Sequence, residues 1–362
     1  MSRETSSFAL PSASRRGLPY LTHVHSFRAI AIIAVVATHV IDHTDWSHVP
    51  PLRRSVATCV FQNGSVLFVF IAGLLFQYLS AGFSFRKYLS SKLRFVIVPY
   101  LLASTPTLLH QYVRRFGIFG PNVYHGNLAE TLVRALVRAS HLPRPFWFIP
   151  MIALFYLLAP AFLWLDRRAR LYLLVIPASL VIAGFAHRPL ALAKPLHAFV
   201  YFLPSYLAGM AAGRYQTVMN LWFVRPWLRW TLTVISLGFI LLETVLLQRS
   251  GALWSEEMFQ RPLTFDVNQI SKLVLTLALL AWLATAPKLL HRNLFLLGEV
   301  SFGVFFVHEY VLLVMDRLLG DTVAGTIPLL LVGTAVTTAV SVAFVWTIKR
   351  ITGKRSRYLV GC

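Results

Sequence analysis

The stretch "HSFRAIAIIAVVATHV", residues 25–40, is a run of small and branched apolar side chains with Arg28 near one end and His39 near the other. Together with its neighbours it is long enough for a membrane-spanning helix, which needs about 20 mostly apolar residues. An arginine and a histidine are costly at bilayer depth, and such residues usually have a partner or a function. The stretch therefore predicts a helix that crosses a membrane and also carries part of a site.

The rest of the chain shares this apolar character. Of its 362 residues, 57% are hydrophobic and only 13% are charged, against about 25% charged in a soluble domain. The apolar residues form long runs, which predicts an all-α polytopic transmembrane helix bundle. We predict ten spans, at about 26–42, 56–80, 95–113, 146–165, 170–187, 196–214, 227–247, 268–286, 294–315 and 323–348.

The net charge of +21 does not indicate nucleic-acid binding in such a chain. Most Lys and Arg residues lie in short loops, where they orient helices and contact anionic lipid head groups. Their distribution predicts both termini in the cytoplasm. We divide the chain into an N-terminal tail (1–25), a membrane domain (26–348) and a basic C-terminal tail (349–362). The connection at about 114–145 has apolar residues at helical spacing and predicts an interfacial amphipathic helix.

Arg28 and His39 are predicted to share one face of the first helix. Eleven residues separate them, which is about 16 Å of rise and about 20° from three full turns. A cation at one end and a titratable imidazole at the other suit a ligand with phosphates at one end and a thioester at the other. The alternative is that both side chains snorkel to the membrane interfaces.

A second polar group lies in "LLGEVSFGVFFVHEYVLLV", residues 296–314. Ser301 and His308 are seven residues apart and share a helix face. The alternative to a functional role is a serine bonded to its own helix and a histidine packed against a neighbour. Glu309 is harder to explain in that way, because a carboxylate in a membrane usually has a partner.

The second span contains "QNGSVLFVFIAGLL", residues 62–75. Asn63 and Ser65 are modest hydrogen-bonding groups in an apolar run. Gly64 and Gly73 predict close approach of neighbouring helices rather than chemistry.

A metal site is the competing chemistry. In "THVIDHTDWSH", residues 38–48, His39 and His43 form an i, i+4 pair of the kind that binds zinc. No third ligand stands at a fixed spacing, so we predict no metal site.

Taken together, the segments resemble the acyltransferase-3 family of polytopic membrane O-acyltransferases. Five segments follow one another in the family's order: "FRAIAIIAVVATH" (27–39), "GSVLFVFIAG" (64–73), "KLRFVIVPY" (92–100), "FWFIPMIALFYLLAP" (146–160) and "SFGVFFVH" (301–308). Two positions depart from the family pattern. Ala72 stands where the family usually has Ser, and His25 stands where it commonly has Asp.

The resemblance implies a multi-pass enzyme of the bacterial plasma (inner) membrane, with residues 26–348 as the acyltransferase domain. It would move an acyl group, usually acetyl, from acyl-CoA to a sugar hydroxyl of a surface polysaccharide, an exopolysaccharide or a lipid-linked precursor. Acyl-CoA would be a co-substrate, with no cofactor bound permanently. Polysaccharide-synthesis proteins are candidate partners, and nucleic acid is not.

The resemblance also implies residue roles. His39 would be the general base or relay the acyl group, and Arg28 would hold the phosphates or the thioester end. The remaining assignments are His308 in catalysis, Arg94 and Ser301 in acyl-CoA binding, and His25, Asn63, Ser65 and Glu309 in support.

Two other functions stay open. Charged residues inside a bundle also mark the path of a transporter or flippase, although we find no inverted repeat. A non-catalytic subunit of a polysaccharide-synthesis complex would not need Arg28 or His39.

Overall fold

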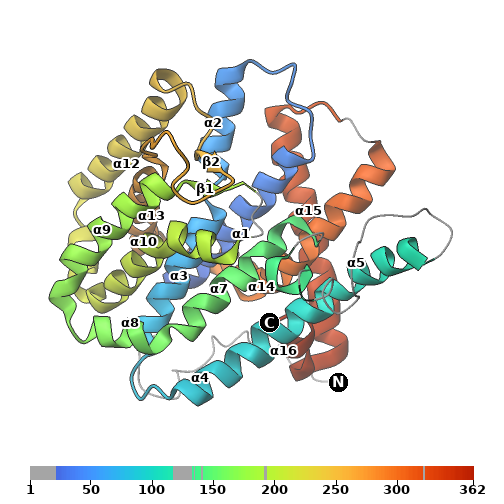
Figure 1. The fold of residues 1–362 in the computed structure, drawn as a ribbon, viewed down its shortest axis with the longest axis horizontal. Helices are drawn as coiled ribbons and strands as arrows, with labels where there is room; N and C mark the ends of the chain where they lie inside the picture. The colour runs from blue at the N-terminus through green and yellow to red at the C-terminus, as the bar shows by residue number, and fades with distance from the viewer. Residues whose placement is uncertain (1–21, 117–132, 134, 140–141, 191–193, 321–322) are drawn as a thin grey trace, which may run out of the picture.

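The structure is a computed structural model that describes residues 22–116, 133, 135–139, 142–190, 194–320 and 323–362. Figure 1 shows a bundle of helices in which α1 (Thr22–Asp42) runs through the interior. Among the described residues the only regular strands are β1 (Arg188–Pro189) and β2 (Trp254–Ser255), which pair in parallel. The predicted all-α transmembrane fold class is confirmed.

In the first half of the chain the elements after α1 are α2 (Pro51–Phe61), α3 (Gly64–Tyr78), α4 (Phe85–Lys92), the π-helical turn η1 (Leu93–Ile97), α5 (Val98–Phe116), the 3₁₀ turn η2 (Arg144–Trp147), α7 (Phe148–Leu157), α8 (Ala159–Asp166), the 3₁₀ turn η3 (Ala169–Leu171) and α9 (Tyr172–Ala186). The predicted amphipathic helix at 114–145 falls largely outside the described residues.

In the second half, apart from β1 and β2, the elements are α10 (Pro195–Arg214), α11 (Gln216–Phe223), α12 (Pro226–Leu241), the π-helical turn η4 (Leu242–Leu246), α13 (Asn268–Ala284), α14 (Lys288–Leu319), α15 (Ile327–Thr352), the 3₁₀ turn η5 (Gly353–Arg355) and α16 (Ser356–Leu359).

Local sequence sets where several helices begin and end. Helices α2, α10 and α12 each start on a proline, whose fixed φ suits the first turn and whose missing N–H would have no partner there. At the start of α15 the hydroxyl of Thr326 accepts a hydrogen bond from the Leu329 N–H. Helix α14 ends at Gly320, which has φ of 87° and donates its N–H to the Asp316 carbonyl.

Each of the ten predicted spans coincides with a helix or a pair of helices. Within the described ranges, seven helical segments are long and apolar enough to cross a membrane, and there are up to eight if the bent pair Arg144–Leu157 and Ala159–Asp166 is one span. Among the described helices, α13 is apolar but shorter, and α10 is not one of these candidates. The count of ten and the cytoplasmic termini stay predictions.

The interior of the bundle is held by close helix contacts. Helix α1 packs against α14, α3 and α15, and α3 packs along α10. A Cβ on Gly73 would lie 2.1 Å from the Tyr206 carbonyl oxygen, and one on Gly209 would lie 2.0 Å from that of Phe70. The close approach predicted from Gly73 is thus confirmed, and a matching glycine on α10 makes it possible.

Candidate active site

The site forms where α1 lies against α14. A Cβ on Gly298 of α14 would be 2.2 Å from the His25 carbonyl oxygen, so only glycine lets the two helices come this close. On another side of α1, a Cβ on Gly64 would be 2.7 Å from the backbone nitrogen of Val35, which confirms the packing role predicted for Gly64. These contacts bring the polar residues of α14 beside those of α1.

His39 lies in this helix contact. Its Nδ1 is 3.5 Å from Oδ2 of Asp42 and 3.8 Å from Oε2 of Glu309. Both distances are longer than a hydrogen bond, and Nδ1 is buried with no hydrogen-bond partner among the described residues. The Glu309 side chain is only 3% exposed. Two carboxylates therefore stand where they would stabilise a positive charge on His39.

His308 stacks at a tilt near His39, with 5.3 Å between the ring centroids. Its Nδ1 lies 2.9 Å from the Val304 carbonyl oxygen, which can only accept, so this nitrogen carries the proton. In the neutral ring Nε2 is then an acceptor, and this atom is buried without a hydrogen-bond partner among the described residues. His308 thus offers a lone pair to the centre of the site.

His43 lies just past the end of α1 and contacts two acidic residues of α14. Its Nδ1 is 2.5 Å from Oδ2 of Asp316, and its Nε2 is 3.3 Å from Oε1 of Glu309. Burial lowers the pKa of His43, but the hydrogen bonds and charges of the two carboxylates raise it by more, so that it lies above its ordinary value. Both ring nitrogens of His43 therefore face carboxylate oxygens, an arrangement that favours the protonated ring.

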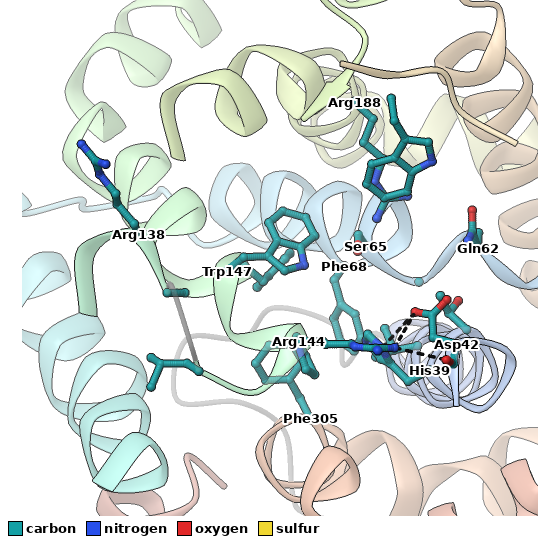
Figure 2. Close-up of a pocket in the computed structure, with 18 residues that line it drawn as sticks. His39, Asp42, Gln62, Ser65, Phe68, Arg138, Arg144, Trp147, Arg188 and Phe305 are labelled. Atoms are coloured by element: carbon teal, nitrogen blue, oxygen red, sulfur yellow. Dashed lines mark hydrogen bonds and ion pairs between the residues drawn. The ribbon is translucent and has the colours of Figure 1, made fainter. Parts of the chain in front are cut away.

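A cavity of about 500 Å³ opens beside His39 and Asp42. Figure 2 shows Arg144 reaching toward these two residues, while Trp147 and Arg188 lie further along the cavity wall. The Nη1 of Arg144 is 3.3 Å from the Asp42 carbonyl oxygen and 4.0 Å from its Oδ2. The cavity thus combines a candidate base with cations and aromatic rings.

A second cavity, of about 570 Å³, adjoins the first. Its wall includes His43, Glu309 and Asp316, and it shares Asp42 and Arg144 with the first cavity. The ion-paired groups of Asp42 and Arg144 therefore lie in the walls of both cavities.

Arg28 lies in a different polar group, nearer the start of α1. Its charge acts on His25, Lys92 and Cys362. The Lys92 ammonium lies over two tyrosine rings, 5.2 Å and 5.1 Å from their centroids. Glu299, whose charge also acts on His25, accepts a hydrogen bond from Lys349 at 2.7 Å. The two polar groups of α1 are therefore separate, as the spacing predicts.

The comparison with protein families shows the class of the protein. A family model described as an acyltransferase domain matches residues 23–346. The chain belongs to this acyltransferase family. Neither a curated protein nor a solved structure matches the chain. The family and the apolar helices make the protein a multi-pass membrane acyltransferase, as the resemblance implies.

Four other residues to which the acyltransferase resemblance gives a role do not all lie at the cavity. Ser65 lines the cavity beside His39. The Asn63 amide donates to the carbonyls of Cys59 and Val60 at the end of α2, a structural contact. The Ser301 hydroxyl donates to the Gly298 carbonyl of its own helix at 2.9 Å. Arg94 is exposed on η1. The roles predicted for these residues stay predictions.

Sequence reasoning did not find several groups that the structure places in the site. Asp316 follows Glu309 by two turns of the same helix, a spacing that could have indicated a shared face. Asp42 was visible only as part of the histidine-rich stretch. Arg144 and Arg188 come from η2 and β1, outside any long apolar run, so no periodicity marks them.

The structure groups three side chains that could bind a metal ion. The candidate ligand group is not the His39–His43 pair considered from the sequence, because His39 lies instead with two residues of α14. His39, His308 and Glu309 each offer one ligand atom, and these atoms lie within 4.8 Å of one another. Two imidazoles and a carboxylate are a common ligand set for a divalent transition metal. The same three groups also suit metal-free base catalysis, and chelation distinguishes the two.

Proposed function

We propose that this membrane acyltransferase transfers an acyl group, usually acetyl, from acyl-CoA to a sugar hydroxyl of a surface polysaccharide, an exopolysaccharide or a lipid-linked precursor. The observation that carries the proposal is His39, which lines a cavity with Glu309 and Asp42 beside its Nδ1. An imidazole in this setting is suited to take a proton from a hydroxyl near neutral pH.

The reaction follows from the groups in the site. Nε2 of His39 takes the proton of the sugar hydroxyl as its oxygen attacks the thioester carbonyl. The carbon–sulfur bond breaks, the acyl group stays on the sugar oxygen, and the CoA sulfur takes the proton back from His39. Glu309 and Asp42 stabilise the imidazolium between these steps. His308, through its buried lone pair, is the candidate to orient a hydroxyl or the imidazole.

The donor would lie along α1. Arg28 is eleven residues from His39, about 16 Å along a helix. The pantetheine arm of CoA likewise separates the phosphates from the thioester. In this proposal Arg28, helped by Lys92 and Arg94, binds the phosphate end at the cytoplasmic side of a bacterial plasma membrane. His39 then acts near the outer side.

The test uses purified protein in lipid nanodiscs with labelled acetyl-CoA and a mixed glycan acceptor. We expect labelled glycan and one free CoA thiol for each acyl group transferred. A transporter or flippase would consume no thioester, and a non-catalytic subunit would behave in the same way. Thioester consumption that is equal in wild type and His39→Ala would contradict the proposed role of His39.

A further inference from the structure

Arg188 lines the cavity beside His39, and the proposed acyl transfer does not use it. It lies in β1, between α9 and α10, and its N–H donates to the Leu253 carbonyl at 2.8 Å. A second hydrogen bond between the two segments runs from the Leu190 N–H to the Ser255 carbonyl, also at 2.8 Å. These backbone hydrogen bonds join the loop before α13 to the segment that carries Arg188.

Buried polar contacts hold both segments in place. The Asp266 carboxylate accepts hydrogen bonds from the N–H groups of Leu253, at 2.9 Å, and Asn268, at 3.0 Å. His197 is buried and its Nε2 is 2.7 Å from the Ala186 carbonyl oxygen, two residues before Arg188. The backbone at Arg188 is therefore fixed by the fold, and its side chain is presented from a rigid support.

Aromatic rings surround the guanidinium of Arg188. Its Cζ is 4.5 Å from the centroid of Trp254, 6.0 Å from that of Trp147 and 5.9 Å from that of Phe202. Such rings attract a cation through their faces but do not neutralise it. They hold the guanidinium at the cavity wall with its charge intact.

In the part of the chain that the structure describes, no carboxylate pairs with this cation. Among the described residues, no hydrogen bond or ion pair joins the Arg188 guanidinium to another group, and its Nε is buried without a partner. The pKa of Arg188 is lowered, because burial disfavours its charge by more than Tyr201 and Asp42 favour it. The guanidinium still stays protonated at physiological pH. A buried, charged donor without an acceptor is costly unless a ligand supplies one.

The rest of the cavity wall is also cationic. Arg138 and Arg144 line it together with Arg188, and Asp42 is the one carboxylate among the described residues of the wall. Trp254 lines the same cavity with 38% of its surface exposed, and the buried Trp147 lines it as well. An indole provides a flat apolar face on which the C–H face of a sugar ring packs.

We infer that Arg188, Trp254 and Trp147 form a subsite for an anionic group, a carboxylate or a phosphate, on the acceptor saccharide. The inference rests on the proposed function, because it places the acceptor in the cavity that His39 lines. In this arrangement the anion pairs with the guanidinium fork, a sugar ring packs on the indole, and a neutral hydroxyl further along reaches His39. The substrate class is therefore an acidic glycan, such as one that contains uronic acid or a sugar phosphate.

The test measures equilibrium binding without any acyl donor, by quenching of tryptophan fluorescence in purified protein. The probes are a glucuronic acid oligosaccharide, the same oligosaccharide after reduction of its carboxyl groups, glucose 1-phosphate and glucose. The variants are Arg188→Gln and Arg188→Lys. The matched control is Arg225→Gln, because Arg225 also lies on an indole, 4.6 Å from the centroid of Trp222, but is exposed and not in the cavity wall.

We expect wild type and Arg225→Gln to prefer at least one acidic probe over its neutral counterpart by about tenfold to a hundredfold, the effect of one charge-assisted contact. Arg188→Gln should lose this preference, and Arg188→Lys should keep part of it, since it retains the charge without the fork. Preference for the uronate identifies a carboxylate ligand, and preference for the sugar phosphate identifies a lipid-linked or phosphorylated acceptor.

Equal binding of acidic and neutral probes by wild type would overturn the inference. An unchanged acidic preference in Arg188→Gln would do so too, and a loss of both kinds of binding alike would mean that Arg188 is only structural. Transfer of labelled acyl groups to the same glycans is a separate readout. An acidic preference without any transfer would refute the proposed function and leave the subsite standing.

Discussion

Replacing Glu309 by Gln tests whether its carboxylate stabilises a charged His39 during acyl transfer. The change keeps the size of the side chain and removes only the charge. Oε2 of Glu309 lies 3.8 Å from Nδ1 of His39. At this distance two unit charges attract by about 4 kcal/mol when the effective dielectric constant is about 20. Asp42 remains at 3.5 Å but is 36% exposed, so water screens it more.

Only the part of this attraction that develops in the transition state affects the rate. A loss of about 3–4 kcal/mol corresponds to a fall in kcat of about a hundredfold to a thousandfold. The acyl-CoA KM should change little, because Glu309 does not lie near Arg28. The assay is initial-rate transfer from labelled acetyl-CoA at saturating acceptor, with thermal melting to verify folding.

Asp316→Asn is the matched control. It removes the other carboxylate partner of His43, at 2.5 Å, but leaves Glu309 beside His39. We expect this variant to keep kcat within about threefold of wild type, less than 1 kcal/mol. A folded Glu309→Gln protein with kcat within about tenfold of wild type would refute the charge-stabilisation argument.

The other expected outcomes concern the same two polar groups. His39→Ala should abolish acyl transfer with a nearly unchanged melting temperature, and an active variant would exclude it as the base. Because the pKa of His43 is raised in the fold, its contacts with the two carboxylates contribute their full stability below pH 6.5, and this contribution is lost as pH rises through the raised pKa. The difference in melting temperature between wild type and His43→Gln should therefore shrink at alkaline pH. A difference that does not change with pH would argue against this coupling. Exhaustive chelation should leave kcat unchanged, whereas a loss restored by zinc would place a metal on the cluster of His39, His308 and Glu309. Arg28→Lys should weaken acyl-CoA binding about tenfold or more in calorimetry, and equal affinity would make Arg28 an interfacial anchor.

Much of the helical frame follows from the sequence, because each span is a continuous apolar run. The histidines of α1 and α14 also stand out, since polar groups in such runs are rare. Two glycines of the second span indicate close packing correctly. The sequence does not show which helix packs against each face of α1 and α14. That His39 meets Glu309, and that His43 meets Asp316, depends on the contact at Gly298, which no spacing within one helix predicts.

The loops were harder to interpret for a different reason. Arg144 and Arg188 look like ordinary basic residues at the ends of apolar runs, where charge distribution explains them without a function. Their importance depends on burial and pairing. Arg144 reaches the end of α1, and Arg188 is enclosed by rings because β1 pairs with β2. Contacts between residues far apart in the chain are set by the whole fold, so local sequence patterns miss them.

The charges around His39 explain how the site can accept a proton. The carboxylates of Asp42 and Glu309 lie beside Nδ1 of His39. Arg144 lies against Asp42, and Asp316 lies against His43. In the proposed reaction, protonation of His39 by a substrate hydroxyl would place a positive charge beside carboxylates that are already in position, so little reorganisation would be needed. His43 contributes by holding Glu309 through its Oε1 and leaving Oε2 beside His39. A neutral residue at position 43 should therefore change kcat, because Glu309 would no longer be held beside His39. A role of His43 in stability alone would not predict this change in kcat.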